Sequence, residues 1–234
     1  MALDAFQADV ARIALDAAGE HGFALAGGNA LVAHGIVQRT TEDVDLFSNE
    51  AGGPGAVTAA VQVALEAAGY QVVITRPPEL SQGEFAQMLV RRGDGSMQLD
   101  LARDWRRWPP VELQVGPVLH LDDAVSSKVN AMVGRGAPRD FIDVGAAIDH
   151  GYTRGELMRL TFIRDPGLRV ADFANAMRQF DQLGLADFAD YGLDEAAISE
   201  LRNRFVGWPR REDDDQEGQA VHAAVAAEER RTRS

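Results

Sequence analysis

Residues 23–47, FALAGGNALVAHGIVQRTTEDVDLF, decide the fold. The stretch opens with an apolar run, Phe23–Ala26, turns at Gly27–Gly28, and ends in an apolar–acidic alternation over Asp43–Phe47. A glycine pair lets the backbone approach a phosphate closely and present its N–H groups as donors. The order strand, glycine turn, helix and acidic strand therefore predicts a phosphate-binding turn beside an acidic strand.

The acidic strand carries two carboxylates on one face. Side chains alternate along a strand, so Asp43 and Asp45 project together while Val44 and Leu46 point to the other face. Carboxylates about 7 Å apart along a strand can hold hard divalent cations such as Mg²⁺. A glycine turn with such a pair suits transfer of a nucleotidyl group from an NTP.

Each of these signals also has an ordinary structural explanation. Asp-x-Asp is common at polar strand edges, and most glycine pairs are simple turns. Their ordered combination is what favours the functional interpretation.

Composition limits the class of protein. The chain has 234 residues, 46% of them hydrophobic and 25% charged, which fits one large or two modest globular domains. It has no cysteine, which excludes disulfides and thiol chemistry. The net charge of −13 argues against a non-specific duplex binder but permits one nucleic-acid end bound at a local basic patch.

The first residues, MALDAFQADVARIALDAAGEHG, carry acids and an amphipathic pattern instead of a basic region followed by an apolar block. This pattern is not that of a signal peptide. No apolar run has the length needed to cross a bilayer. We therefore expect a cytoplasmic protein with no membrane association.

The order of predicted elements indicates an α+β fold with a mixed sheet, because strands and helices do not alternate strictly. We expect a core domain over residues 1–120 and a helical C-terminal domain over residues 121–234. Strands are predicted at 23–26, 43–47, 71–75, 85–91 and 97–102. Helices are predicted at 3–18, 29–34 (with Asn29 as its cap), 57–68, 121–133, 139–150, 153–160, 170–180, 193–205 and 219–231.

Two blocks of short motifs occur along the chain: Gly27–Leu31, Arg39, Thr41 and Asp43–Phe47, then Ser127–Ala131, Arg135–Ala137 and Arg139–Val144. Together they resemble the motifs of the AbiEii/AbiGii-type nucleotidyltransferase toxins, which include the mycobacterial MenT toxins. The second block, Lys…Ala…Arg…Arg-Asp-x-x-Asp, separates this family from other transferases that share only Gly-Gly and Asp-x-Asp. Asn29 stands where Thr is frequent, and Thr41 where Ser is frequent; neither change removes a metal ligand.

The resemblance implies a DNA-polymerase-β-like nucleotidyltransferase core followed by a helical C-terminal domain. It implies a toxin of a type IV toxin–antitoxin pair, active in abortive phage defence or growth control and bound by a cognate antitoxin protein. Relatives attach nucleotides to RNA, including the 3′ acceptor end of tRNA. The implied co-substrate is an NTP and the implied cofactor is Mg²⁺.

A third carboxylate often completes such a site, and Asp100 is the candidate. Leu99 and Leu101 are expected to face the core, so Asp100 faces the same side as Asp43 and Asp45 if the strands are neighbours. It would ligate the metal or take the proton of the attacking hydroxyl. A polar edge position is the structural alternative, and Asp104 is a weaker candidate for the same role.

Two cations of the 121–133 helix are candidates for triphosphate binding. Lys128 borders an apolar stripe, and Arg135 would lie on nearly the same face if the helix extends that far. The alternative is a lysine that covers the rim of the core. We expect Lys128→Ala to change thermal stability little.

Other residues enter through the resemblance. Asp140 is expected as a catalytic carboxylate that orients Lys128 or helps to activate the acceptor, with Asp143 as its structural partner. A first-turn carboxylate that stabilises the helix dipole is the alternative. Arg39 and Thr41 are expected beside the phosphate or the acidic pair, with a surface loop charge as the alternative for Arg39. His34 is expected as a packed residue at a helix end.

Three functions compete. The first is an RNA-directed nucleotidyltransferase toxin. The second is a small-molecule nucleotidyltransferase that modifies an antibiotic with the same core, and the second motif block favours the toxin. The third is a degenerate binding module, which the intact Gly27–Gly28, Asp43, Asp45 and Lys128 set argues against.

Overall fold

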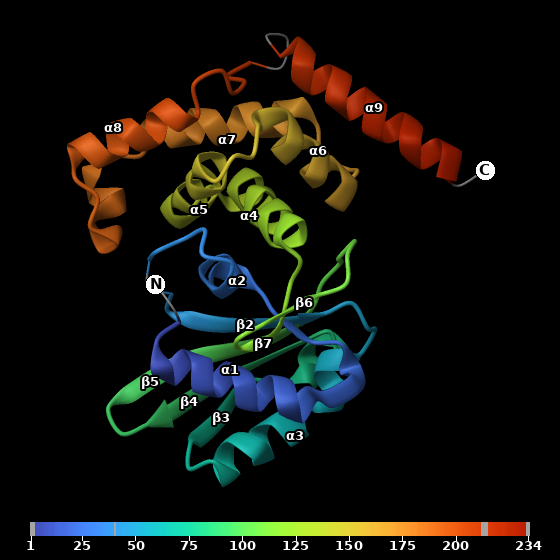
Figure 1. Ribbon diagram of the computed structural model, residues 1–234, viewed down its shortest axis with the longest axis vertical. Coiled ribbons are helices and arrows are strands. Elements are labelled where there is room, and N and C mark those ends of the chain that lie inside the picture. The colour runs from blue at the N-terminus through green and yellow to red at the C-terminus, as the bar shows by residue number, and fades with distance from the viewer. Residues whose placement is uncertain (1–2, 40, 212–214, 233–234) are drawn as a thin grey trace. The chain divides into compact units, whose positions relative to one another are not determined.

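A computed structural model describes residues 3–39, 41–211 and 215–232 (Figure 1). The chain divides into two compact units, Met1–Ala124 and Val125–Ser234, whose boundary lies inside helix α4 (Leu121–Arg135). The first unit contains the sheet and the second is helical. The architecture is therefore α+β, as the order of predicted elements indicated.

In the described residues the sheet has seven strands in the order β3-β4-β5-β2-β1-β7-β6. Strand β2 runs parallel to β5 and antiparallel to β1, while β3, β4 and β5 are antiparallel neighbours. The sheet is thus mixed, as predicted. The strands are β1 (Ala24–Leu25), β2 (Asp43–Ser48), β3 (Gln71–Arg76), β4 (Phe85–Arg92), β5 (Gly95–Arg103), β6 (Val111–Leu113) and β7 (Gly116–Val118).

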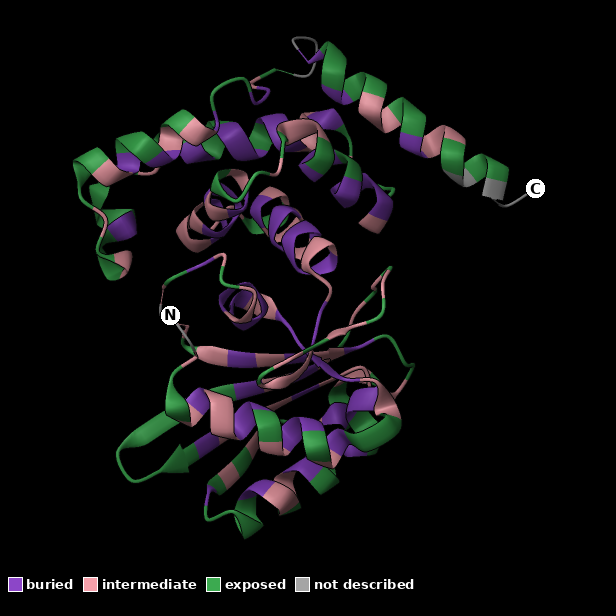
Figure 2. Ribbon diagram, in the orientation of Figure 1, coloured by how far each residue is buried: buried purple, intermediate pink, exposed green. Residues whose placement is uncertain are grey.

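The two faces of the sheet differ in chemistry. Val44 and Leu46 of β2 are fully buried, whereas Asp43 and Asp45 are half-buried, and Figure 2 shows this alternation along β2. We call the side that carries Asp43, Asp45 and Asp100 the carboxylate face, and the opposite side the helix face. Apolar burial on the helix face supplies the main stabilisation of this unit.

Helices α1 (Ala5–Ala18) and α3 (Gly53–Ala67) pack together against the sheet (Figure 1). Asp4 caps α1 by accepting hydrogen bonds from the backbone N–H groups of Phe6 and Gln7. Helix α2 (Gly27–Ala33) is short and begins at the glycine turn. Two 3₁₀ turns, Gly19–His21 and Pro78–Ser81, complete the described connections.

Two predictions for this unit were wrong. Strands β6 and β7 were not predicted, because each has three residues, Pro117 lies within β7, and neither is long enough to show a period of two. Asn29 does not cap α2: the helix begins two residues earlier, and the Asn29 side chain donates to the carbonyl of Asp43 at 2.8 Å instead.

The second unit is a helical assembly around aromatic side chains. Phe141 and Phe180 stack with ring centroids 4.2 Å apart, and Phe205 meets both rings edge-on. Its elements are the rest of α4, α5 (Pro138–Asp149), α6 (Arg154–Arg164), α7 (Val170–Gln182), the 3₁₀ helix Leu185–Tyr191, α8 (Glu195–Arg204) and α9 (Gln216–Thr232). Among the helices that are described, none combines the length and apolarity needed to cross a bilayer.

A buried carboxylate fixes the segment that joins β5 to β6. Asp123 is fully buried and accepts hydrogen bonds from the backbone N–H groups of Arg107 at 3.0 Å and Trp108 at 3.0 Å. Replacing it leaves these donors without this acceptor. We expect Asp123→Ala to lower the free energy of unfolding of the purified protein by about 2–4 kcal/mol in urea titrations.

Asp122→Ala is the matched control, because the neighbouring carboxylate also lies in the first turn of α4 but its side chain is 31% exposed. Its expected loss is within about 0.5 kcal/mol. Equal losses in the two variants would mean that helix-dipole stabilisation, and not the anchored segment, is the common cause.

Candidate functional site

The pairing of β2 with β5 brings the predicted carboxylates together. Asp45 lies directly opposite Asp100, and Asp43 lies opposite Gln98. Leu99 and Leu101 are fully buried, so Asp100 faces the same side as Asp45. The expectation that the two acidic strands are neighbours is confirmed.

The glycine turn contacts the acidic strand at Asp45. The backbone N–H of Ala26 donates to the carbonyl of Asp45 at 2.8 Å. Gly27 has φ +58°, and a Cβ added there would lie 1.8 Å from Oδ2 of Asp45. Both the backbone angle and the close carboxylate therefore require glycine at this position.

Gly28 brings two more predicted residues to the turn. A Cβ at Gly28 would lie 2.9 Å from Nη2 of Arg39 and 3.0 Å from Cγ2 of Thr41. Arg39 and Thr41 therefore lie beside the glycine pair, as expected for residues near a phosphate. An arginine in this place offers a planar set of donors to phosphate oxygens.

A hydrogen-bond network holds the start of β2, and one of its members was not predicted. The Gln7 side chain donates to the carbonyl of Thr41 at 2.6 Å and accepts from the Thr41 hydroxyl at 3.1 Å. The same hydroxyl also lies within hydrogen-bond distance of the Asn29 side-chain oxygen, and the Asn29 amide donates to the carbonyl of Asp43. Gln7 is 6% exposed. The available signal was its place three residues before Val10, on the apolar stripe of an amphipathic helix.

The Asp100 carboxylate hydrogen-bonds Gln87, but one of its oxygens has no partner among the described residues. Burial raises the pKa of Asp100; a hydrogen bond from the Gln87 side chain lowers it, the Asp43 charge raises it, and Arg76 lowers it. Oδ1 of Asp100 is buried without a hydrogen-bond partner among the described residues. A buried carboxylate oxygen left in this way fits a cation or a proton donor that arrives with the substrate.

The carboxylates fit a magnesium site that the substrate completes. Within the described ranges, no three Asp, Glu, His or Cys side chains form a ready-made metal-binding group. Mg²⁺ usually takes one or two carboxylates, several waters and substrate phosphates. Asp45 and Asp100, with Asp43 on the same face, supply carboxylates of that kind.

Two other predicted residues lie elsewhere. Asp104 lies beyond the end of β5, where its carboxylate accepts from the N–H of Trp105 at 2.8 Å. The ring nitrogen Nε2 of His34 lies 2.8 Å from the carbonyl of Leu119, which fits a packed residue at the end of a helix.

In the second unit, the motif residues form two ion pairs between α4 and α5. Nζ of Lys128 lies 2.9 Å from the Asp143 carboxylate, and Arg135 donates two hydrogen bonds of 2.7 Å to Asp140. The α4 helix reaches Arg135, as required for both cations to share a face. Of the two roles expected for Asp140, the one that orients Lys128 was wrong, because Asp143 lies against Lys128 and Asp140 binds Arg135.

Burial of these ion pairs changes the loss of stability that is expected when one partner is removed. Both carboxylates are fully buried; the Lys128 side chain is 10% exposed and that of Arg135 is 50% exposed. Removing Lys128 leaves the Asp143 charge buried without its ion-pair partner. The expectation that Lys128→Ala would change stability little is therefore inconsistent with the structure.

The chain matches the family described as nucleotidyl transferase AbiEii toxin, type IV toxin–antitoxin system, over residues 10–215. The chain belongs to the AbiEii family. It is thus a nucleotidyltransferase of a toxin family, and the family match favours the toxin over the small-molecule transferase. Among curated proteins, none matches the sequence.

Two solved structures have a similar fold. MenT4, a nucleotidyltransferase toxin from Mycobacterium tuberculosis, is 18% identical with a TM-score of 0.56, over 95% of this chain and 94% of that one. JHP933 from Helicobacter pylori is 14% identical with a TM-score of 0.55, over 99% of this chain and 98% of that one. At these identities the likeness concerns the fold.

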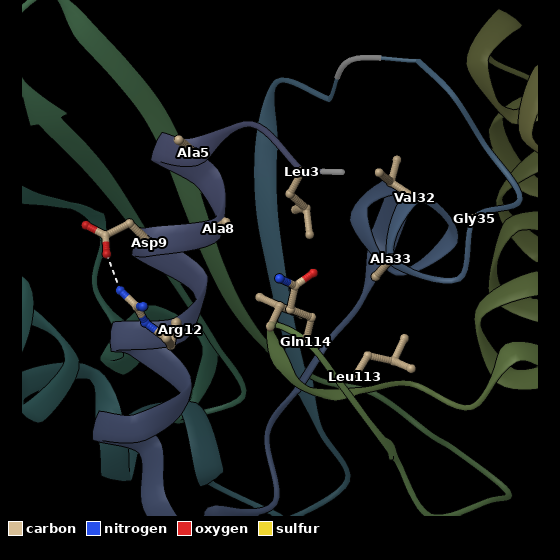
Figure 3. A pocket seen from close by; sticks show the side chains of 11 residues that line it. Leu3, Ala5, Ala8, Asp9, Arg12, Val32, Ala33, Gly35, Leu113 and Gln114 are labelled. Carbon is tan, nitrogen blue, oxygen red and sulfur yellow. Dashed lines mark hydrogen bonds and ion pairs between the residues drawn. The ribbon is translucent and has the colours of Figure 1, made fainter. Parts of the chain in front are cut away.

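A cavity of about 520 Å³ in this AbiEii protein is lined by none of Asp43, Asp45 and Asp100. Figure 3 shows it between α1, the C-terminal end of α2 and the β6–β7 turn, with the Asp9–Arg12 ion pair at its wall. Val32, Ala33 and Leu113 supply much of its apolar lining. It contains none of the predicted site residues.

Gly27→Ala tests the contact between the glycine turn and Asp45. The added methyl group must displace the Asp45 carboxylate, so we expect nucleotidyl transfer to fall by on the order of 10²-fold or more, the scale for loss of a preorganised charged group. Gly35→Ala is the control, because Gly35 has φ +75° but no atom within 4 Å of the added Cβ. Equal transfer rates in the two variants would show that backbone strain alone matters.

Lys128→Ala should lower the free energy of unfolding by about 3–5 kcal/mol, because the buried Asp143 charge loses the Lys128 ammonium. Adding Asp143→Asn removes that charge and should restore most of the stability without restoring nucleotidyl transfer. Chemical denaturation and a transfer assay on both variants measure the two effects. Recovery of full transfer in the double variant would assign Lys128 a structural role only.

Proposed function

We propose that this AbiEii protein is a Mg²⁺-dependent enzyme that transfers nucleotides from an NTP to the 3′ end of an RNA in the cytoplasm. A tRNA is the expected acceptor, and a modified acceptor end would block translation and growth. A cognate antitoxin protein would oppose this activity. The observation that carries the proposal is the alignment of Asp45 opposite Asp100 with Gly27 in contact with the Asp45 carboxylate.

In the first unit, different residues would bind the metal ion and the phosphates. Asp43, Asp45 and Asp100 would hold Mg²⁺, which when bound neutralises charge on the triphosphate. Gly27 and Gly28 would bind the phosphates through backbone N–H groups, with Arg39 and Thr41 beside them. In the second unit, the family motif supports Lys128 and Arg135 as triphosphate ligands and Asp140 as the carboxylate that orients Arg135.

In the transfer step, one bond to the α-phosphorus forms, one breaks, and one proton is released. The 3′ hydroxyl oxygen bonds to the α-phosphorus, and the bond from the α-phosphorus to the leaving pyrophosphate breaks. The hydroxyl proton passes to a base, for which Oδ1 of Asp100 is the candidate because it has no hydrogen-bond partner in the described residues. Positioning and electrostatic stabilisation account for most of the rate in such reactions.

The purified protein should label a tRNA pool when incubated with Mg²⁺ and each radiolabelled NTP in turn, and one or more NTPs should support transfer. Asp45→Ala and excess EDTA should each abolish labelling, because losing the carboxylate or the metal leaves the triphosphate charge uncompensated. Circular dichroism and a melting curve check that Asp45→Ala is folded.

Induction in a bacterium without the antitoxin gives a second measurement of the same function. The wild type should arrest growth, and Asp43→Ala should relieve the arrest. Labelling that persists in EDTA would rule out the metal-dependent mechanism. Arrest by a folded, inactive Asp43→Ala protein would point to sequestration of a cellular target.

A further inference from the structure

A row of polar side chains crosses the sheet from the catalytic carboxylates to its edge. Asp45 of β2 lies opposite Asp100 of β5, Asp100 lies opposite Gln87 of β4, and Gln87 lies opposite Arg76 of β3. Residues directly opposite each other project from the same face of a sheet. The row therefore lies on the carboxylate face and ends at an exposed arginine on the edge strand.

A bulge in β3 places Arg76 on this face. Ile74 pairs with Met88, which is fully buried on the helix face, and in a regular strand Arg76 would share that face two residues later. The register shifts between Ile74 and Arg76, so that Arg76 pairs with Gln87 instead. Bulges of this kind redirect a side chain. The guanidinium carbon of Arg76 lies 4.9 Å from the ring centroid of Phe85, a residue of the carboxylate face.

In the strand order of the sheet, the glycine turn and Asp100 lie on opposite sides of β2. The glycine turn follows β1, on one side of β2, while Asp100, Gln87 and Arg76 lie on successive strands on the other side. In phosphoryl transfer, the attacking and leaving oxygens lie roughly in line across the phosphorus. If the triphosphate occupies the glycine turn, the acceptor hydroxyl approaches from the side of Asp100.

We propose that the carboxylate face of β3, β4 and β5 binds the acceptor strand, with Arg76 contacting a phosphodiester group near its 3′ end. This inference rests on the proposed function and specifies its acceptor as an anionic polymer. Stacking on Phe85 holds the guanidinium plane and leaves its edge donors available to phosphate oxygens. In a chain of net charge −13, an exposed cation beside the carboxylates supplies the local attraction that an anionic acceptor needs.

Gln87 has a positioning role in this surface. The Thr75 hydroxyl lies 3.1 Å from the Gln87 side-chain oxygen and 3.2 Å from the Gln87 backbone carbonyl. The Gln87 side chain hydrogen-bonds Asp100. The Asp100 carboxylate is thus held by one oxygen while Oδ1 has no described partner.

Arg76→Ala tests the surface, with Arg92→Ala as the matched control. Arg92 is also an exposed arginine of this sheet and lies 4.2 Å from the ring centroid of Tyr70, but it pairs with Asp9 of α1 on the helix face. In steady-state transfer assays, Arg76→Ala should raise the KM for RNA by about tenfold and leave the KM for the NTP unchanged, because a charge-assisted contact to the acceptor alone is lost. The slope of log binding constant against log salt concentration should fall by about 1 for Arg76→Ala. Arg92→Ala should change neither.

An RNA with one uncharged methylphosphonate linkage near its 3′ end identifies the contact. It should weaken binding to the wild type and cause no further loss in Arg76→Ala. Equal behaviour of Arg76→Ala and Arg92→Ala, or a rise in the KM for the NTP instead of RNA, would overturn the inference. If the wild type transfers no nucleotide to any RNA, the proposed function is wrong, and RNA binding measured by filter binding then tests the acceptor surface by itself. RNA binding that depends on Arg76 would support the acceptor surface. RNA binding that does not depend on Arg76 would overturn it.

Discussion

The parallel pairing of β2 with β5 is the constraint on which the candidate site depends. It sets Asp45 opposite Asp100, and a register shift of one residue would turn one of these carboxylates into the apolar face. Burial of Val44, Leu46, Leu99 and Leu101 opposes such a shift, because the two apolar side chains of whichever strand slipped would leave the core. The apolar face therefore fixes the chemistry of the polar one.

In the second unit, the buried carboxylates form ion pairs between two helices. Asp140 and Asp143 are buried one turn apart on α5, and each binds a cation of α4. The Lys128 pair is almost closed to water, whereas the Arg135 side chain is half exposed. A buried pair restricts the lysine to one geometry at a desolvation cost. The same motif thus places one cation rigidly and leaves the other accessible.

The sequence predicted the parts of the structure that depend on local pattern. Alternation over residues 43–47 and 97–102 identified the acidic strands and the outward direction of Asp100. It did not identify β6 and β7, whose three-residue lengths show no period. The partner of Lys128 depends on how two helices cross, and spacing along one helix carries no information about that crossing. Gln7 was missed because its function appears only when Thr41 is adjacent in space.

The face of the sheet on which Arg76 lies could not be predicted from the alternation of residues along the strand. Strict alternation places it with Ile74, toward the helices, and only the bulge brings it to the carboxylate face. A bulge leaves one residue unpaired and weakens the ladder locally, so an edge strand tolerates it best. Here the edge strand carries it, and the redirected arginine ends the row that begins at Asp45 and Asp100. The irregularity in the sheet is thus what extends the candidate site beyond the two strands that its motif encodes.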